Sequence, residues 1–125
     1  MNRWTGATRV VALAAGLLTL AAGIWAFAAP SSFYRSIATF PPYNRHLVHD
    51  LGAFQIGLGV TLLLALLWSD SLLVALAGFA TAATVHFAGH VIDHNLGGHT
   101  ATDLVGLGLL AAATLAAALA RASRC

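Results

Sequence analysis

The chain has 125 residues, of which 59% are hydrophobic and only 8% are charged. Because soluble domains carry roughly 25% charged residues, this composition excludes an ordinary soluble domain and indicates a single integral-membrane domain over residues 1–125. The net charge of +2 comes from arginines that flank apolar segments, which is typical of a topology signal and argues against a nucleic-acid partner. The basic residues are all arginine and the acidic residues all aspartate, which together with the many alanines favours a bacterial, high-GC source.

Four apolar segments are long enough to cross a bilayer as helices, for which about 20 residues suffice. We expect these spans near residues 8–29, 45–68, 72–94 and 102–120. The first begins with arginines and ends in Ala26-Phe27-Ala28, which imitates a signal-peptide cleavage site. Its apolar run is longer than a usual signal core, so we expect it to be retained as a true span.

The segment between the first two spans, residues 30–39, has large apolar residues at helical spacing among polar ones. This pattern predicts a short interfacial helix after the first span. Pro41 and Pro42 fit the first turn of the next helix, where a missing N–H is tolerated. We therefore expect that helix to begin before its apolar core, with Thr39 as its cap.

The arginines also predict how the chain is oriented. More of them flank the two termini than lie in the first loop, and positive residues favour the cytoplasmic side. We expect a multi-pass protein of the plasma (inner) membrane with both termini in the cytoplasm. The arginines near the termini are Arg3, Arg9, Arg121 and Arg124, and those in the first loop are Arg35 and Arg45.

All six histidines and three of the four aspartates lie at the opposite, outward end of the spans. An ionisable group at membrane depth indicates a functional site by default. The residues concerned are His46, His49, Asp50, His86, His90, Asp93, His94, His99 and Asp103.

Spacing predicts that several of these side chains meet. The very short turn at residues 69–71 makes the second and third spans antiparallel neighbours. With ~1.5 Å of rise per residue, His90 is then level with His49 and Asp50, and His94 with His46. Residues 86, 90 and 94 form one helical stripe, and Asp103 at the start of the fourth span reaches a similar height.

This constellation favours a metal site or a haem site. Imidazole suits zinc, copper and iron, and metal sites in helix bundles use inward side chains from facing helices. A transition metal would be bound by His46, Asp50, His86, His90, His94 and Asp103. Haem is the variant interpretation, with His49 and His90 as its axial ligands.

A second interpretation belongs to a different class of protein. A hydrogen-bonded histidine cap would produce the same pattern, and the high glycine and alanine content favours tight helix association. The chain would then be an accessory subunit or assembly factor of a larger membrane complex, or a homo-oligomer. Enzymatic activity stays open, because no nucleophile–base motif is present and hydrolysis would need a metal-bound water. An ion path is disfavoured because the inward halves of the spans lack titratable groups, although an oligomeric pore remains open.

Two segments carry a family resemblance. Residues Tyr43-Asn44-Arg45-His46-Leu47-Val48-His49-Asp50-Leu51-Gly52-Ala53-Phe54 and His86-Phe87-Ala88-Gly89-His90-Val91-Ile92-Asp93-His94 resemble a family of small four-span membrane proteins common in actinobacteria, with a more distant likeness to DoxX-type proteins. The resemblance implies an all-α transmembrane four-helix antiparallel bundle. It matches the family pattern at His46, Asp50, His86, His90, His94 and Asp103, and it implies no activity.

Overall fold

The chain folds almost entirely into helices. The computed structural model describes the backbone of residues 3–123 and the side chains of residues 6–68 and 70–123. In chain order the elements are α1 (Arg3–Ala28), α2 (Pro30–Ser36), α3 (Arg45–Ala65), the 3-10 turn η1 (Ser69–Ser71), α4 (Leu72–Ile92) and α5 (Thr100–Ala122). The four long helices α1, α3, α4 and α5 are each apolar enough to cross a membrane. The predicted all-α class and the four predicted apolar spans are therefore confirmed.

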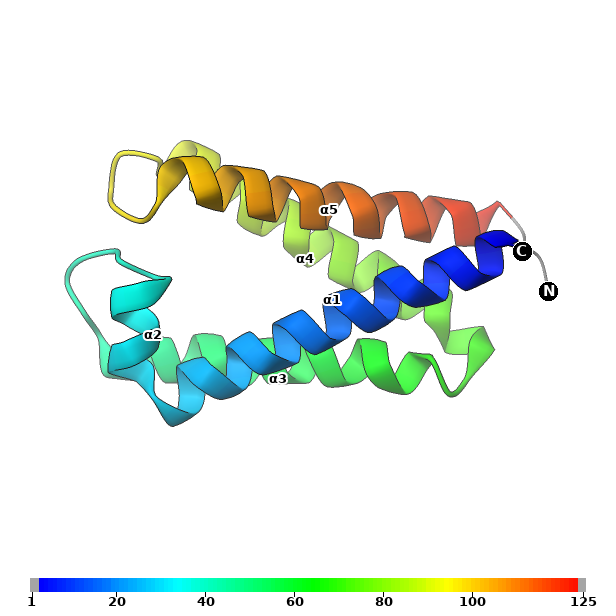
Figure 1. The fold of residues 1–125 in the computed structure, drawn as a ribbon, viewed down its shortest axis with the longest axis horizontal. Helices are drawn as coiled ribbons and strands as arrows, with labels where there is room; N and C mark the ends of the chain where they lie inside the picture. Colours follow the sequence, from blue (N-terminus) through cyan, green and yellow to red (C-terminus); the bar gives the residue numbers. More distant parts are fainter. Residues whose placement is uncertain (1–2, 124–125) are drawn as a thin grey trace.

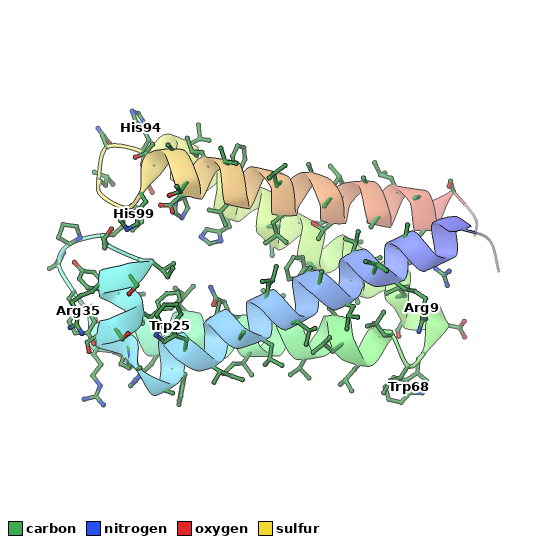
Figure 2. The ribbon with its side chains drawn as sticks, viewed as in Figure 1. Arg9, Trp25, Arg35, Trp68, His94 and His99 are labelled. Atoms are coloured by element: carbon green, nitrogen blue, oxygen red, sulfur yellow. The ribbon has the colours of Figure 1, made fainter. Side chains whose placement is uncertain are left out.

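The two ends of the molecule carry different side chains. The start of α1, the end of α5 and η1 lie at one end of the long axis, and α2 and the loop from α4 to α5 lie at the other (Figure 1). Arg9 and Trp68 lie near the first end, whereas Arg35, His94 and His99 lie near the second (Figure 2). We call the second end, with α2 and the loops at residues 37–44 and 93–99, the histidine end.

Helices α1 and α3 touch backbone to backbone. A Cβ atom added to Gly23 would lie 2.7 Å from the backbone nitrogen of Ile56, and one added to Gly52 would lie 2.8 Å from the carbonyl oxygen of Gly23. Further along α3, a Cβ atom added to Gly59 would lie 2.8 Å from the carbonyl oxygen of Gly16. Small residues let membrane helices approach in this way, so this pair of helices is fixed by its glycines.

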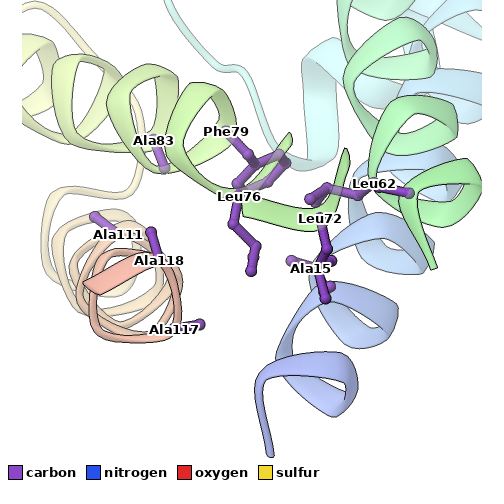
Figure 3. Close-up of a cluster of buried hydrophobic side chains, with 11 residues drawn as sticks. Ala15, Leu62, Leu72, Leu76, Phe79, Ala83, Ala111, Ala117 and Ala118 are labelled. Carbon is purple, nitrogen blue, oxygen red and sulfur yellow. The ribbon is translucent and has the colours of Figure 1, made fainter. Parts of the chain in front are cut away.

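All four long helices contribute to a buried core. Leu62 of α3 and Leu72 and Leu76 of α4 are at most 1% exposed, and Ala15 of α1 and Ala111 of α5 close the cluster (Figure 3). Most of these residues are alanine or leucine, which pack without leaving polar atoms unsatisfied. The core is therefore formed by side chains that tie the α1–α3 pair to the α4–α5 pair.

The short turn between α3 and α4 does not make those two helices close partners. Helix α3 packs chiefly on α1, and α4 packs chiefly on α5, while α3 and α4 contact each other far less. The expectation that the second and third spans pack directly side by side is therefore met only weakly. The physical reason is the glycine face of α3, which is turned toward α1.

The predicted short helix after the first span is present as α2. Its Phe33 is 3% exposed and packs with Ala26 and Val48, which fastens α2 to α1 and α3. The next helix, α3, begins before its apolar core, at Arg45, as predicted for the second span; the expectation that Pro41 and Pro42 form its first turn is wrong, because they lie in the preceding loop. The cap is Asn44, whose side chain accepts a hydrogen bond from the backbone N–H of Leu47 at 3.1 Å.

Candidate functional site

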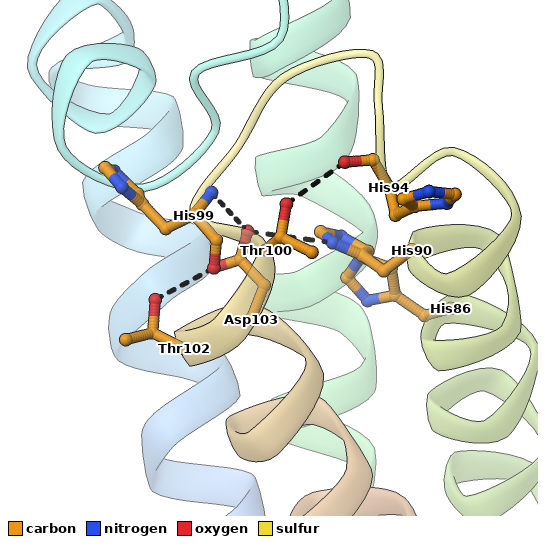
Figure 4. A network of polar contacts seen from close by, with 7 residues as sticks. All are labelled: His86, His90, His94, His99, Thr100, Thr102 and Asp103. Atoms are coloured by element: carbon orange, nitrogen blue, oxygen red, sulfur yellow. Dashed lines mark hydrogen bonds and ion pairs between the residues drawn. The ribbon is translucent and has the colours of Figure 1, made fainter.

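The centre of the candidate site is a pair of histidines on the last two turns of α4. His86 and His90 are one turn apart, so their side chains project from the same face of the helix. Their Nε2 atoms lie 3.2 Å apart, and the ring centroids are 4.9 Å apart (Figure 4). The predicted i, i+4 pairing of these two residues is therefore present.

Asp103, on the first turn of α5, joins this pair. Its Oδ2 atom lies 3.8 Å from Nδ1 of His90, and the two side chains are only 17% and 19% exposed. The same oxygen accepts a hydrogen bond from the backbone N–H of His99 at 2.8 Å (Figure 4). A carboxylate at a helix N-terminus is stabilised by the helix dipole, so Asp103 both binds the backbone N–H of His99, the N-cap residue of α5, and faces the imidazole of His90.

The loops at the histidine end cover this group. The ring of Phe40 stands edge-on to the ring of His90, with centroids 5.4 Å apart. The backbone N–H of Gly98 donates to the carbonyl of Thr39 at 3.1 Å, which ties the two loops together. Gly98 has φ of +78°, and an added Cβ would lie 2.7 Å from the Phe40 ring. A glycine is therefore needed for this closure.

A cleft of about 530 Å³ opens beside the histidines, between the α1–α3 pair and the α4–α5 pair. Its walls are mostly apolar, with aromatic side chains from several elements. The polar side chains among its lining residues are Thr19, Gln55, His86, His90 and Asp103, and the aromatic ones are Trp25, Phe33, Phe40 and Phe79. A largely apolar cleft with a few convergent polar groups is the usual form of a small-molecule site.

The histidine and aspartate predicted from the start of the second span do not join this group. His46 and Asp50 form their own i, i+4 pair, with Nε2 and Oδ2 3.5 Å apart and side chains 86% and 51% exposed. His49 packs instead against Phe27 of α1, with ring centroids 5.0 Å apart. Because α3 turns its glycines toward α1, its histidines point to other neighbours than α4.

The third member of the predicted histidine stripe is also displaced. Helix α4 ends at Ile92, with Asp93 as its C-cap, so the prediction of a helix up to His94 is wrong. The Nδ1 atom of His94 lies 3.1 Å from the carbonyl oxygen of Val91, within its own turn. His99 is the residue before α5 and contributes its backbone N–H to Asp103.

Among the side chains that the structure describes, three of the predicted ligands lie together: His86, His90 and Asp103. The other three predicted ligands, His46, Asp50 and His94, lie apart from them. Within this part of the chain no group of three or more His, Cys, Asp or Glu side chains is arranged to hold a metal ion. The predicted haem pair, His49 and His90, has each ring against a different aromatic neighbour, Phe27 and Phe40.

Two residues of the cleft were not anticipated. Trp25 has the sequence context of a membrane-interface anchor, but it lines the cleft and donates through Nε1 to Ser32 at 3.2 Å. Phe40, which follows the segment predicted as a short helix, covers His90. The only signal for Phe40 was its place in the loop that enters the second span, and nothing local indicated which histidine it would contact.

Searches against models of known families, against curated proteins and against solved structures find no match to this chain.

Proposed function

We propose that the chain is a multi-pass membrane protein that binds a transition-metal ion at its histidine end through His86 and His90. The main observation behind this proposal is the 3.2 Å distance between the Nε2 atoms of these two residues, on one face of α4. Two nitrogens bound to one ion at about 2.0–2.1 Å lie roughly 3.3 Å apart at a tetrahedral angle. The pair therefore has the spacing of two ligands of a single ion before any ion is added.

Asp103 supports the same proposal from the other side of the ring. A metal-binding histidine usually presents its second ring nitrogen to a carboxylate, which fixes the tautomer and the ring orientation. His90 presents Nε2 to His86 and Nδ1 to Asp103. Asp103 is thus a positioning residue for His90, and the remaining coordination positions of the ion would face the cleft. Imidazole ligands favour zinc, copper or iron.

The membrane placement forms part of the proposal. We infer that the four long helices are antiparallel spans of the plasma membrane and that α2 lies at its outward surface. Arg9 and Arg121 lie at the end of the molecule where α1 starts and α5 ends, while Arg35 and Arg45 lie at the histidine end. Arg3 and Arg124, which also entered the sequence prediction, have side chains outside the described residues. Counted with Arg3 and Arg124 by their place in the sequence, four arginines flank the termini against two at the histidine end, which supports cytoplasmic termini.

Metal analysis of the purified protein tests the proposal. The protein is purified without chelator and without a polyhistidine tag, exposed to Zn²⁺ or Cu²⁺, desalted, and analysed for metal and for absorbance. We expect about one ion per chain in the wild type, and loss of that ion in His86→Ala and His90→Ala. Asp103→Asn should weaken binding roughly 10–100-fold, since it removes only the carboxylate behind the ligand.

His46→Ala is the matched control, because His46 belongs to the exposed pair on α3. It should retain the ion. A metal content well below one per chain, or equal content in His90→Ala and the wild type, would overturn the proposal. The 3.2 Å contact would then be a His–His hydrogen bond, and stoichiometric partner proteins would favour the accessory-subunit interpretation. A Soret band would favour haem instead.

A further inference from the structure

The cleft beside His86 contains a polar atom with no partner. The Oε1 atom of Gln55, on α3, is buried and accepts no hydrogen bond within the described part of the chain. Leaving a buried acceptor unsatisfied costs free energy. Gln55 lines the cleft, and the last torsion of a glutamine side chain is broad, so a hydrogen-bond donor in the cleft could draw Oε1 into a hydrogen bond and remove this cost.

Gln55 and His86 lie at the same depth on different helices. Gln55 precedes η1, and His86 follows it, by nearly the same number of residues. At ~1.5 Å of rise per residue, both lie about 21 Å from that turn along the helix axes. The cleft therefore offers a hydrogen-bond acceptor from α3 and an imidazole from α4 at one level, and apolar walls elsewhere.

When no metal ion is bound, the charges at the cleft select against anionic ligands. Among its lining residues, all within the described part of the chain, none is arginine or lysine, and Asp103 is an acid that is only 17% exposed. A fatty-acid carboxylate or a lipid phosphate would be repelled by Asp103 at short range and in a poorly solvated place. The polar head of the occupant is therefore uncharged.

The aromatic walls describe the rest of the ligand. Trp25 lies edge-on to Phe33, with ring centroids 5.6 Å apart, and Phe40 covers His90. Aromatic faces and edges of this kind pack well against another aromatic ring. The cleft lies between helices that are long and apolar enough to cross a bilayer, so its occupant can enter from the lipid phase.

We infer that the cleft binds a lipid-soluble molecule whose uncharged head is a hydroxylated aromatic ring, a phenol or a quinol, with an apolar tail. One ring hydroxyl donates to Oε1 of Gln55, and the ring contacts the imidazole of His86. This site does not require a bound metal ion, and it is tested in the presence of a chelator. Its failure and the failure of the metal proposal are therefore separate results.

Fluorescence of Trp25 measures occupancy, because this residue lines the cleft. The experiment uses the full chain in nanodiscs with Trp4→Phe and Trp68→Phe, so that Trp25 is the remaining tryptophan. The probe is a decyl-substituted hydroquinone, and the matched ligand is its dimethyl ether, which keeps the shape but donates no hydrogen bond. Palmitate and a long-chain aliphatic alcohol are further probes, and a monohydroxylated decylphenol separates phenol from quinol.

We expect saturable quenching by the hydroquinone and at least tenfold weaker binding of the dimethyl ether. Gln55→Leu and His86→Leu should each weaken hydroquinone binding about tenfold, and His46→Ala should leave it unchanged. Circular dichroism confirms that each variant is folded, and Gln55→Glu, which keeps the side-chain size and an acceptor oxygen, should retain hydroquinone binding. Equal binding of the ether, tighter binding of palmitate or of the aliphatic alcohol, or wild-type affinity in Gln55→Leu would overturn the inference.

Discussion

The two helix pairs of this protein are held together by different means. Helices α1 and α3 meet through glycines, so that backbone atoms of one helix lie against the other. Helices α4 and α5 meet through side chains such as Ala83 and Ala111, and at Gly108 the neighbour is the ring of Phe87. One pair is joined by close backbone contacts, whereas the other carries His86, His90 and Asp103 at its outer end.

This difference explains where the cleft lies. Because the glycine face of α3 packs against α1, α3 cannot also pack closely along α4, although a short turn joins these two helices. The space left between the pairs is lined by larger side chains, including Phe79 and Leu110, and by the polar group of α4 and α5. The close glycine contacts between α1 and α3 thus leave room for a site beside α4 and α5.

The largest expected effect comes from breaking the glycine contact. In Gly52→Leu the new side chain would meet the carbonyl oxygen of Gly23 and the backbone nitrogen of Phe27, where a Cβ alone already lies within 2.9 Å. We expect a loss of about 3 kcal/mol or more in the free energy of unfolding, since backbone atoms cannot move aside as side chains do. SDS titration of the purified protein, followed by circular dichroism, measures this loss.

Gly57→Leu is the matched control on the same helix, because an added Cβ there meets nothing within 4 Å. Its free energy of unfolding should equal or exceed that of the wild type, by up to about 0.8 kcal/mol, because leucine favours a helix over glycine. Equal destabilisation by the two leucines would mean that α1 and α3 are not fixed by these glycines.

A smaller effect is expected at the histidine end. In Gly98→Ala the residue keeps a left-handed conformation that costs about 1–2 kcal/mol for a residue with a Cβ, and the methyl group would also displace the Phe40 ring. We expect a lower unfolding midpoint and altered Trp25 fluorescence, because Phe40 and Trp25 line the same cleft. Gly89→Ala, at an open position on α4, is the control; it should leave the Trp25 fluorescence unchanged and should not lower the unfolding midpoint, because alanine favours a helix over glycine.

The helices could be predicted because their signals are local. Apolar length alone identified the four spans, and spacing alone identified the pairing of His86 with His90. Helix ends were less accurate, since Asn44 caps α3 after a proline-containing loop that itself resembled a first helical turn. An end that shifts by two residues is enough to take His94 out of its stripe.

The contacts between helices could not be predicted in the same way. The small face of α3 was visible in the sequence, but its partner depends on how the helix is rotated, and that rotation is decided by Gly16 and Gly23 of a distant segment. Once α3 turns toward α1, His49 meets Phe27 and the pair of His46 and Asp50 stays exposed. Matching residues by height on neighbouring spans fixes their depth but not the direction of their side chains.

The smallest expected effect tests the contrast between the two helix pairs directly. In Gly108→Ala the added Cβ would lie 3.2 Å from the edge of the Phe87 ring, a side chain that can turn slightly. Alanine is also a better helix former than glycine by about 0.8–1.0 kcal/mol, so the two effects nearly cancel. We expect a change of about 0.5 kcal/mol or less in the free energy of unfolding. Gly106→Ala, with nothing within 4 Å, gives the propensity gain alone. If Gly108→Ala were instead as damaging as Gly52→Leu, α4 and α5 would depend on a close backbone contact just as α1 and α3 do.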